Sequence, residues 1–135
     1  MKYLLDTNIC IYFLKGKYQL NDKFDEVGFD NLYISEITVA ELKYGAENSN
    51  YPEKNRKVIQ ELSSQFKQIP IFNSLNIYAK EKARLRKEGK IIDDFDLLIG
   101  ATAIANDMTL VTNNEKHFDK LKKIKIDNWT KKLNF

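Results

Sequence analysis

The sequence is poor in the residues that build disulfides, histidine-based sites and long turns. Its 135 residues include one cysteine, one histidine, five glycines and two prolines. A lone Cys10 can form no intrachain disulfide and no cysteine-based metal cluster. A lone His117 excludes ribonucleases that pair two histidines as acid and base. A zinc site would have to rely on carboxylates, which suit that ion less well.

Long apolar runs are also missing. Only three apolar residues stand between Lys2 and Asp6, far fewer than a secretory signal needs, and no apolar stretch approaches membrane-spanning length. We therefore expect a cytoplasmic protein without a membrane segment. The net charge of +3 is ordinary for a soluble domain and does not by itself indicate nucleic-acid binding.

What the sequence does contain is the composition of a packed globular fold. Hydrophobic residues make up 43% of the chain and charged residues 30%. The length suits a single domain that covers residues 1–135. We find no internal repeat, linker or low-complexity tract.

Short apolar runs alternate with segments of helical periodicity along the chain. Strands are expected at residues 3–5, 32–34, 69–72, 109–112 and, more briefly, 124–126. Helices are expected at about 9–14, 38–45, 53–66, 74–88 and 94–106. Parallel neighbours need crossover connections, so this order favours an α/β fold with a mostly parallel sheet of four to five strands and helices on both faces.

Three acidic residues stand in apolar surroundings near predicted helix starts. Asp6 ends the first apolar run, Glu41 is flanked by alanine and leucine, and Asp96 by phenylalanine and leucine. Burial of an unpaired carboxylate is costly, so each needs a partner. The positive end of a helix is the simplest partner, and Glu41 can also form a capping box with Thr38. Taken singly, each carboxylate could be structural.

Taken together, the three carboxylates favour a metal site. In a parallel α/β sheet, ligands bind outside the carboxyl ends of the strands, where helix starts gather. Like charges brought close there repel unless one is protonated or a cation lies between them. Oxygen ligands without histidine or cysteine suit Mg²⁺, with Mn²⁺ as an alternative. Such an ion can activate water and stabilise charge on phosphate oxygens, which points to phosphate chemistry.

Helix geometry indicates which aspartate of the segment 93–96 would bind the ion. Asp94 and Asp96 lie two residues apart, so their side chains diverge by about 200° on a helix and cannot share a ligand. With Asp93 or Asp94 as the N-cap, Asp96 can face the sheet edge from the first turn. Small residues at Gly100 and Ala103, on the same stripe, predict a close approach of this helix to the sheet.

A basic segment precedes these aspartates. Residues 80–90 hold six basic residues against two acidic ones. A solvated helix face with Glu–Lys pairs is the ordinary interpretation, but beside a metal site the segment could contact a phosphate backbone. The candidate RNA contacts are Lys82, Arg84, Arg86, Lys87 and Lys90.

Four motifs stand in sequence order: residues 4–9 (LLDTNI), residues 35–46 around Glu41, residues 89–103 around Asp96, and residues 110–118, followed by Asn128 and Trp129. Together they resemble the PIN domain and, within it, the VapC-type toxins of toxin–antitoxin systems. The likeness spans nearly the whole chain.

The resemblance implies a PIN-like three-layer fold and a Mg²⁺-dependent endoribonuclease. It also implies a homodimer and a VapB-like antitoxin whose tail enters the active site. Asp6, Glu41 and Asp96 would be metal ligands. Thr7 and Thr112 would support the site, with Thr7 also capping the first helix. The subset with a similar amino terminus includes toxins that cut initiator tRNA, which makes tRNA the leading substrate prediction.

One departure from the family pattern lies in the fourth motif. Many members carry an acidic residue where this chain has Asn114. An amide can still coordinate weakly or orient water, but it weakens the case for a second ion. Asp119, five residues on, is a candidate substitute, although a surface position is the more ordinary interpretation.

Two other functions fit part of the sequence. A haloacid-dehalogenase-like phosphatase would need a second aspartate two residues after Asp6, where this chain has Asn8, and it would leave Glu41 without a role. A catalytically weak binding module that acts through an antitoxin is favoured by Asn114. That second alternative predicts that Mg²⁺ changes neither thermal stability nor RNA cleavage.

Overall fold

A five-stranded parallel sheet forms the centre of the computed structural model, which describes residues 1–131. The strands are β1 (Tyr3–Leu5), β2 (Leu32–Ser35), β3 (Lys67–Ile69), β4 (Thr109–Val111) and β5 (Lys125–Asp127). Their spatial order is β3-β2-β1-β4-β5, and each neighbouring pair is parallel. The central strand β1 therefore carries Asp6 to the middle of the carboxyl edge.

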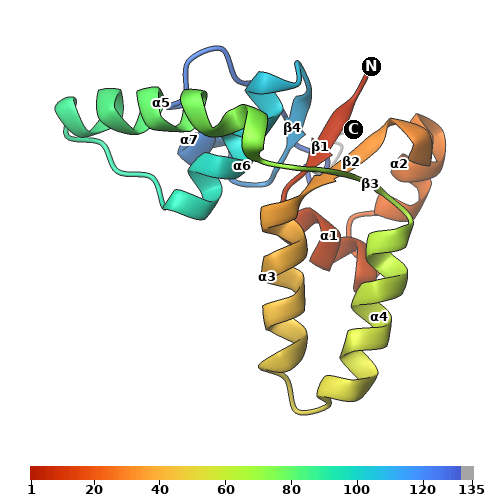
Figure 1. Ribbon diagram of the computed structural model, residues 1–135. Helices are drawn as coiled ribbons and strands as arrows, with labels where there is room; N and C mark the ends of the chain where they lie inside the picture. Colours follow the sequence, from red (N-terminus) through yellow and green to blue (C-terminus); the bar gives the residue numbers. More distant parts are fainter. Residues whose placement is uncertain (132–135) are drawn as a thin grey trace.

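Helices surround this sheet on two sides (Figure 1). They are α1 (Thr7–Leu14), α2 (Leu20–Val27), α3 (Glu36–Glu47), α4 (Pro52–Ser64), α5 (Leu75–Lys87), α6 (Asp94–Ala105) and α7 (Glu115–Phe118), with 3-10 turns at Phe29–Asn31 and Phe72–Ser74. No helix within residues 1–131 is both long enough and apolar enough to cross a bilayer.

Successive residues of β1 point to opposite faces of the sheet, and each face has its own core. Leu4 packs in a cluster with Leu97 and Phe118, from α6 and α7. Leu5 packs in the other cluster with Ile9 and Phe24, from α1 and α2. The predicted α/β fold of three layers is thereby confirmed.

Several element bounds differ from those predicted. The third strand ends at Ile69 rather than residue 72, because Pro70 has no N–H to donate to a ladder. Helix α2 was not predicted, although Leu20, Phe24 and Val27 have the spacing of a helix face.

Two predicted helix caps are wrong. Ser35, not Thr38, is the N-cap of α3, and its Oγ accepts a hydrogen bond from the Ile37 N–H at 2.9 Å. Asp6, not Thr7, is the N-cap of α1. Since α3 begins earlier than predicted, Glu41 lies beyond the first turn, where it forms no capping box and meets a different partner.

The prediction that Gly100 packs against the sheet is also wrong. The space beside its α-carbon is taken by the side chains of Leu121 and Phe118 rather than by the sheet, and a methyl group here would clash with Leu121. The small residue therefore allows α6 to pack against α7 and the segment that follows it.

Candidate active site

Asp6 stands at the carboxyl end of β1 and is only 5% exposed. Its Oδ1 accepts a hydrogen bond from the Thr7 N–H at 2.8 Å, and its Oδ2 accepts one from Thr112 Oγ1 at 2.8 Å. Thr112 directly follows β4, the neighbouring strand. Asp6 and Thr112, at the ends of two neighbouring strands, are therefore joined by a buried hydrogen bond.

Glu41 reaches the same region from α3. Its Oε1 accepts a hydrogen bond from Thr7 Oγ1 at 2.7 Å, and that hydroxyl also lies 3.0 Å from Thr38 Oγ1. Thr38 is fully buried. Thr7 is the first residue of α1, and its hydroxyl thus links that helix to α3. Thr7 therefore positions the Glu41 side chain, whereas the predicted role as helix cap belongs to Asp6.

Asp96 enters from the first turn of α6. The cap of this helix is Asp93, whose Oδ2 accepts a hydrogen bond from the Phe95 N–H at 3.2 Å. The Asp96 side chain is 31% exposed, and its Oδ2 lies 3.2 Å from His117 Nε2, at ion-pair distance but without hydrogen-bond alignment. Asp94 bonds elsewhere, to Lys82 and Tyr78.

The three carboxylates influence one another's protonation. Burial raises the pKa of Asp6 to about 6, against the hydrogen bonds from Thr112 and Thr7, and the charges of Asp96 and Glu41 raise it further. Burial also raises the pKa of Glu41, with the Asp96 charge adding to the effect. Asp6, Glu41 and Asp96 therefore share one electrostatic environment, as their predicted convergence requires.

The pKa of Asp96 is set by opposing neighbours. Burial raises it, the nearby His117 lowers it, and the charge of Asp93 raises it again. Sequence reasoning did not assign His117 or Asp93 to the site. The available signal for His117 was its place in the short segment just after β4, whose carboxyl end carries Thr112.

Asn114 takes part through its backbone. Its N–H donates to Thr112 Oγ1 at 3.0 Å, and its carbonyl accepts from the His117 N–H at 3.1 Å. This turn fixes the hydroxyl that holds Asp6 and starts the helix that carries His117. Asp119, the candidate substitute, is exposed at the end of α7.

The donor set suits a hard divalent ion, although the side chains are not preassembled around one. Asp6, Glu41 and Asp96 offer only oxygen, the ligand that Mg²⁺ and Mn²⁺ prefer. Each carboxylate keeps lone pairs beyond the hydrogen bonds described above. Within residues 1–131, no three acidic, histidine or cysteine side chains already stand close enough to hold an ion together.

The basic side chains of segment 80–90 differ in how they are bonded within the chain. Arg84 donates to Glu81, to Glu88 and to the Lys120 carbonyl, and its side chain is only 20% exposed. Lys82 is paired with Asp94 at 2.8 Å.

The other basic side chains of this segment are exposed, although Lys90 Nζ lies 3.7 Å from Glu88 Oε2. Arg86, Lys87 and Lys90 lie towards the carboxyl end of α5 and just beyond it. Arg86 and Lys90 line a hollow of about 220 Å³ beside Asp93 and Asp94. Of the predicted RNA contacts, Arg86, Lys87 and Lys90 are therefore more accessible to a ligand than Arg84 and Lys82.

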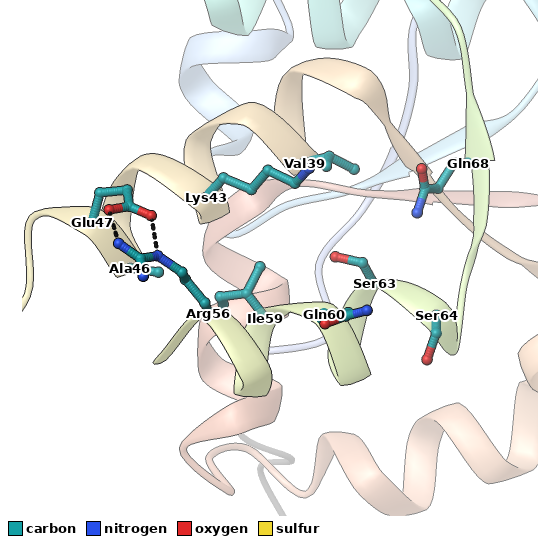
Figure 2. Close-up of a pocket in the computed structure, with 10 residues that line it drawn as sticks. All are labelled: Val39, Lys43, Ala46, Glu47, Arg56, Ile59, Gln60, Ser63, Ser64 and Gln68. Carbon is teal, nitrogen blue, oxygen red and sulfur yellow. Dashed lines mark hydrogen bonds and ion pairs between the residues drawn. The ribbon is translucent and has the colours of Figure 1, made fainter. Parts of the chain in front are cut away.

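A second concave surface lies between α3 and α4, which extend together away from the sheet (Figure 1). This cavity has a volume of about 580 Å³. Figure 2 shows side chains that line it, among them the apolar Val39 and Ile59 and the ion pair of Arg56 with Glu47. None of the three carboxylates lines it. Helix α3, which carries Glu41, also lines one side of this cavity through Val39 and Lys43.

Comparison with known families agrees with the motifs. The PIN domain family matches residues 3–124. The chain belongs to the PIN domain family. Within that family, "Ribonuclease VapC2" of Haemophilus influenzae is 37% identical over 134 residues, which cover 96% of this chain and 98% of the relative. Our chain is therefore a VapC-type PIN domain.

Two further relatives bear on this PIN domain. The "tRNA(fMet)-specific endonuclease VapC" of Salmonella typhimurium is 31% identical and covers 96% of this chain and 98% of its own. A crystal structure of VapBC2 from Rickettsia felis, bound to a DNA fragment from its promoter, superposes with a TM-score of 0.88 at 34% identity. The match covers 96% of this chain and 99% of that one.

Proposed function

We propose that this PIN domain is a Mg²⁺-dependent endoribonuclease and the toxin of a toxin–antitoxin pair. The observation that carries the proposal is that burial raises the pKa values of Asp6, Glu41 and Asp96, from β1, α3 and α6, and that the charge of Asp96 raises those of the other two further. Acidic groups arranged against their own repulsion favour a cation as the missing partner.

In this proposal, Asp6, Glu41 and Asp96 hold the ion, with Mn²⁺ as an alternative to Mg²⁺. The ion would activate a water molecule and neutralise charge on the phosphate. Thr112 fixes the Asp6 carboxylate and Thr7 fixes that of Glu41, so that each keeps one orientation. Such supporting hydrogen bonds commonly affect metal affinity or activity by about 10- to 100-fold.

The proposed substrate is RNA, with initiator tRNA as the first candidate because of the Salmonella relative's name. Arg86, Lys87 and Lys90 are the proposed phosphate contacts. Arg84 is left out because its guanidinium is already bonded within the chain. Affinity should fall with salt, since phosphate contacts release counterions.

The proposed partner is a VapB-like antitoxin. The superposed Rickettsia felis structure is a VapBC complex, which supports this assignment. We further propose a cytoplasmic homodimer whose active site is blocked by the antitoxin tail. In this arrangement, free toxin cleaves RNA and the complex does not.

The test is cleavage of total RNA by antitoxin-free protein. EDTA should stop cleavage and added Mg²⁺ should restore it, while Glu41→Gln should reduce it by at least about 100-fold. The matched control is Glu53→Gln, on the exposed first turn of α4, which should cleave normally.

Each competing function gives a different result. Cleavage that persists both in EDTA and in Glu41→Gln would contradict the metal–carboxylate mechanism. Hydrolysis of small phosphate monoesters by wild type and Glu41→Gln alike would instead favour the phosphatase. Failure of Mg²⁺ to change either thermal stability or RNA cleavage would favour the binding module.

A further inference from the structure

The turn between α1 and α2 holds an unusual backbone. Helix α1 ends in a Schellman motif, in which the Gly16 N–H donates to the Phe13 carbonyl and the Lys17 N–H to that of Tyr12. Gly16 has φ +68°, as that motif requires. Tyr18 and Gln19 then also adopt left-handed conformations, with φ 60° and 55°. Two consecutive left-handed residues that are not glycine are costly and call for a reason.

The turn places one tyrosine ring against another. The rings of Tyr18 and Tyr12 lie 5.2 Å apart between centroids at an interplanar angle of 75°, an edge-to-face arrangement. Lys17 Nζ lies 5.8 Å from the centroid of the Tyr12 ring. Tyr18 remains 46% exposed, so its ring is held in place and still accessible.

This aromatic pair is connected to the acidic edge by direct contacts. The Tyr12 hydroxyl accepts a hydrogen bond from Asn113 Nδ2 at 3.0 Å. Asn113 directly follows Thr112, the residue whose hydroxyl holds Asp6. The chain from Asp6 through Thr112 and Asn113 to Tyr12 therefore fixes the rings relative to the carboxylates.

A positioned, accessible ring beside a cation suits one kind of ligand at a ribonuclease site. Sequence-tolerant recognition of single-stranded RNA stacks unpaired bases on aromatic side chains, with lysine or arginine on the neighbouring phosphates. Lys15 and Lys17 are exposed and form no ion pair within residues 1–131. A base in a duplex has no free face, so such a surface selects unpaired nucleotides.

We propose that Tyr18, supported by Tyr12, stacks an unpaired nucleobase of the RNA next to the cleaved bond, with Lys17 contacting the adjacent phosphate. This inference rests on the nuclease function proposed above and specifies its substrate: a single-stranded segment such as a loop. Tyr12 and Asn113 are positioning residues, because they act by holding the Tyr18 ring.

The test measures binding without cleavage, in EDTA. The probe is a 2-aminopurine-labelled single-stranded RNA oligonucleotide, with the same strand in a duplex for comparison. Tyr18→Ala and Tyr18→Leu should weaken binding of the single strand roughly tenfold and abolish stacking-induced quenching of 2-aminopurine. Tyr18→Phe should retain both, and duplex affinity should not change in any variant.

The matched control is Tyr51→Ala, which removes a ring that is 71% exposed just before α4. It should bind the single strand as wild type does. Equal binding by Tyr18→Leu and Tyr18→Phe would overturn the stacking proposal, as would an equal loss in Tyr51→Ala. So would a Tyr18→Ala defect that affects only antitoxin binding.

Cleavage assays separate this inference from the nuclease proposal. If cleavage depends on Mg²⁺ and Glu41 but KM is unchanged in Tyr18→Ala, the stacking proposal is wrong and the nuclease proposal stands. If quenching depends on the Tyr18 ring but the protein cleaves no RNA, the stacking proposal stands and the nuclease proposal is wrong. Where both hold, Tyr18→Ala should raise KM more than it lowers kcat.

Discussion

Asp94 and Asp96 lie two residues apart in the first turn of α6 and have opposite surroundings. Asp94 accepts hydrogen bonds from Lys82 Nζ at 2.8 Å and the Tyr78 hydroxyl at 2.9 Å, and these hold its pKa below the ordinary value. Burial raises the pKa of Asp96. The pKa values of Asp94 and Asp96, two carboxyl groups in the same helical turn, are therefore shifted in opposite directions.

The contrast extends to the regions around them. In the α5–α6 region, Arg84 is bonded to Glu81, and the pKa of that glutamate is lowered. At the carboxyl edge of the sheet, Asp6 and Glu41 meet hydroxyl groups and one another's charge. Within residues 1–131, Arg84 and Asp94 are thus paired with opposite charges, whereas Asp6 and Glu41 accept hydrogen bonds from neutral groups and Asp96 lies beside His117.

The largest expected effect separates the two aspartates of α6 by activity. Asp96→Asn should lower kcat/KM for RNA cleavage by at least about 100-fold, because it removes a proposed metal ligand. Asp94→Asn should leave it within about twofold, since that carboxylate pairs with an exposed lysine. The measurement is initial cleavage rates on one RNA at saturating Mg²⁺. The reverse order of losses would mean that the wrong carboxylate was assigned to the site.

The next largest effect is a gain in the free energy of unfolding on substitution of Asp6, in contrast to the loss of activity expected for Asp96. The pKa of Asp6 is raised from 3.8 to about 6, so the unfolded chain loses this proton more readily than the folded one. In EDTA, the group's favourable contribution is therefore fully present below about pH 4 and lost as the pH rises to about 6. Asp6→Asn should be more stable than wild type at pH 7, by up to about 3 kcal/mol.

Urea unfolding of wild type and Asp6→Asn across pH 4–7.5 measures this gain. The difference should be small at the acid end and level off above the pKa of Asp6. A variant that is clearly less stable than wild type at pH 7 would show that the Asp6 carboxylate is structural. That result would contradict the assignment of Asp6 as a metal ligand.

These comparisons also explain what the sequence could and could not predict. Alternation of apolar runs predicted the parallel sheet, and the rule that ligands bind at the carboxyl ends of its strands predicted where Asp6 lies, because strand ends are set by topology. Side-chain partners depend on geometry that periodicity does not contain. Thr38 was a good cap by type, but the backbone enters α3 at Ser35, which turns Thr38 towards Thr7.

Short helical segments were the hardest to predict. Helix α2 spans 8 residues, so its three apolar positions cover only about two turns and give a brief pattern between two loops. The local sequence around His117 does not indicate that this side chain lies near Asp96, because their closeness depends on how α7 packs against α6. The small size of Gly100 predicts a close helix contact, but the sequence does not indicate that Leu121 and Phe118 are the neighbours.

The smallest expected effect tests the other half of the comparison, the ion pair of Lys82 and Asp94. The side chains are 37% and 54% exposed, so water and salt screen their attraction. A double-mutant cycle of Lys82→Met and Asp94→Asn should give a weak coupling at low salt that vanishes at about 1 M salt, where the Debye length is about 3 Å.

This coupling should also depend on pH with a sign opposite to that of Asp6. The pKa of Asp94 is lowered in the folded protein, so its contribution is present above its ordinary pKa and disappears on acidification through the lower folded value. Urea unfolding at pH 7 and pH 3 measures the change. A coupling that survived high salt would place Asp94 among the buried charges, and the two aspartates of α6 would no longer mark the boundary between fold and site.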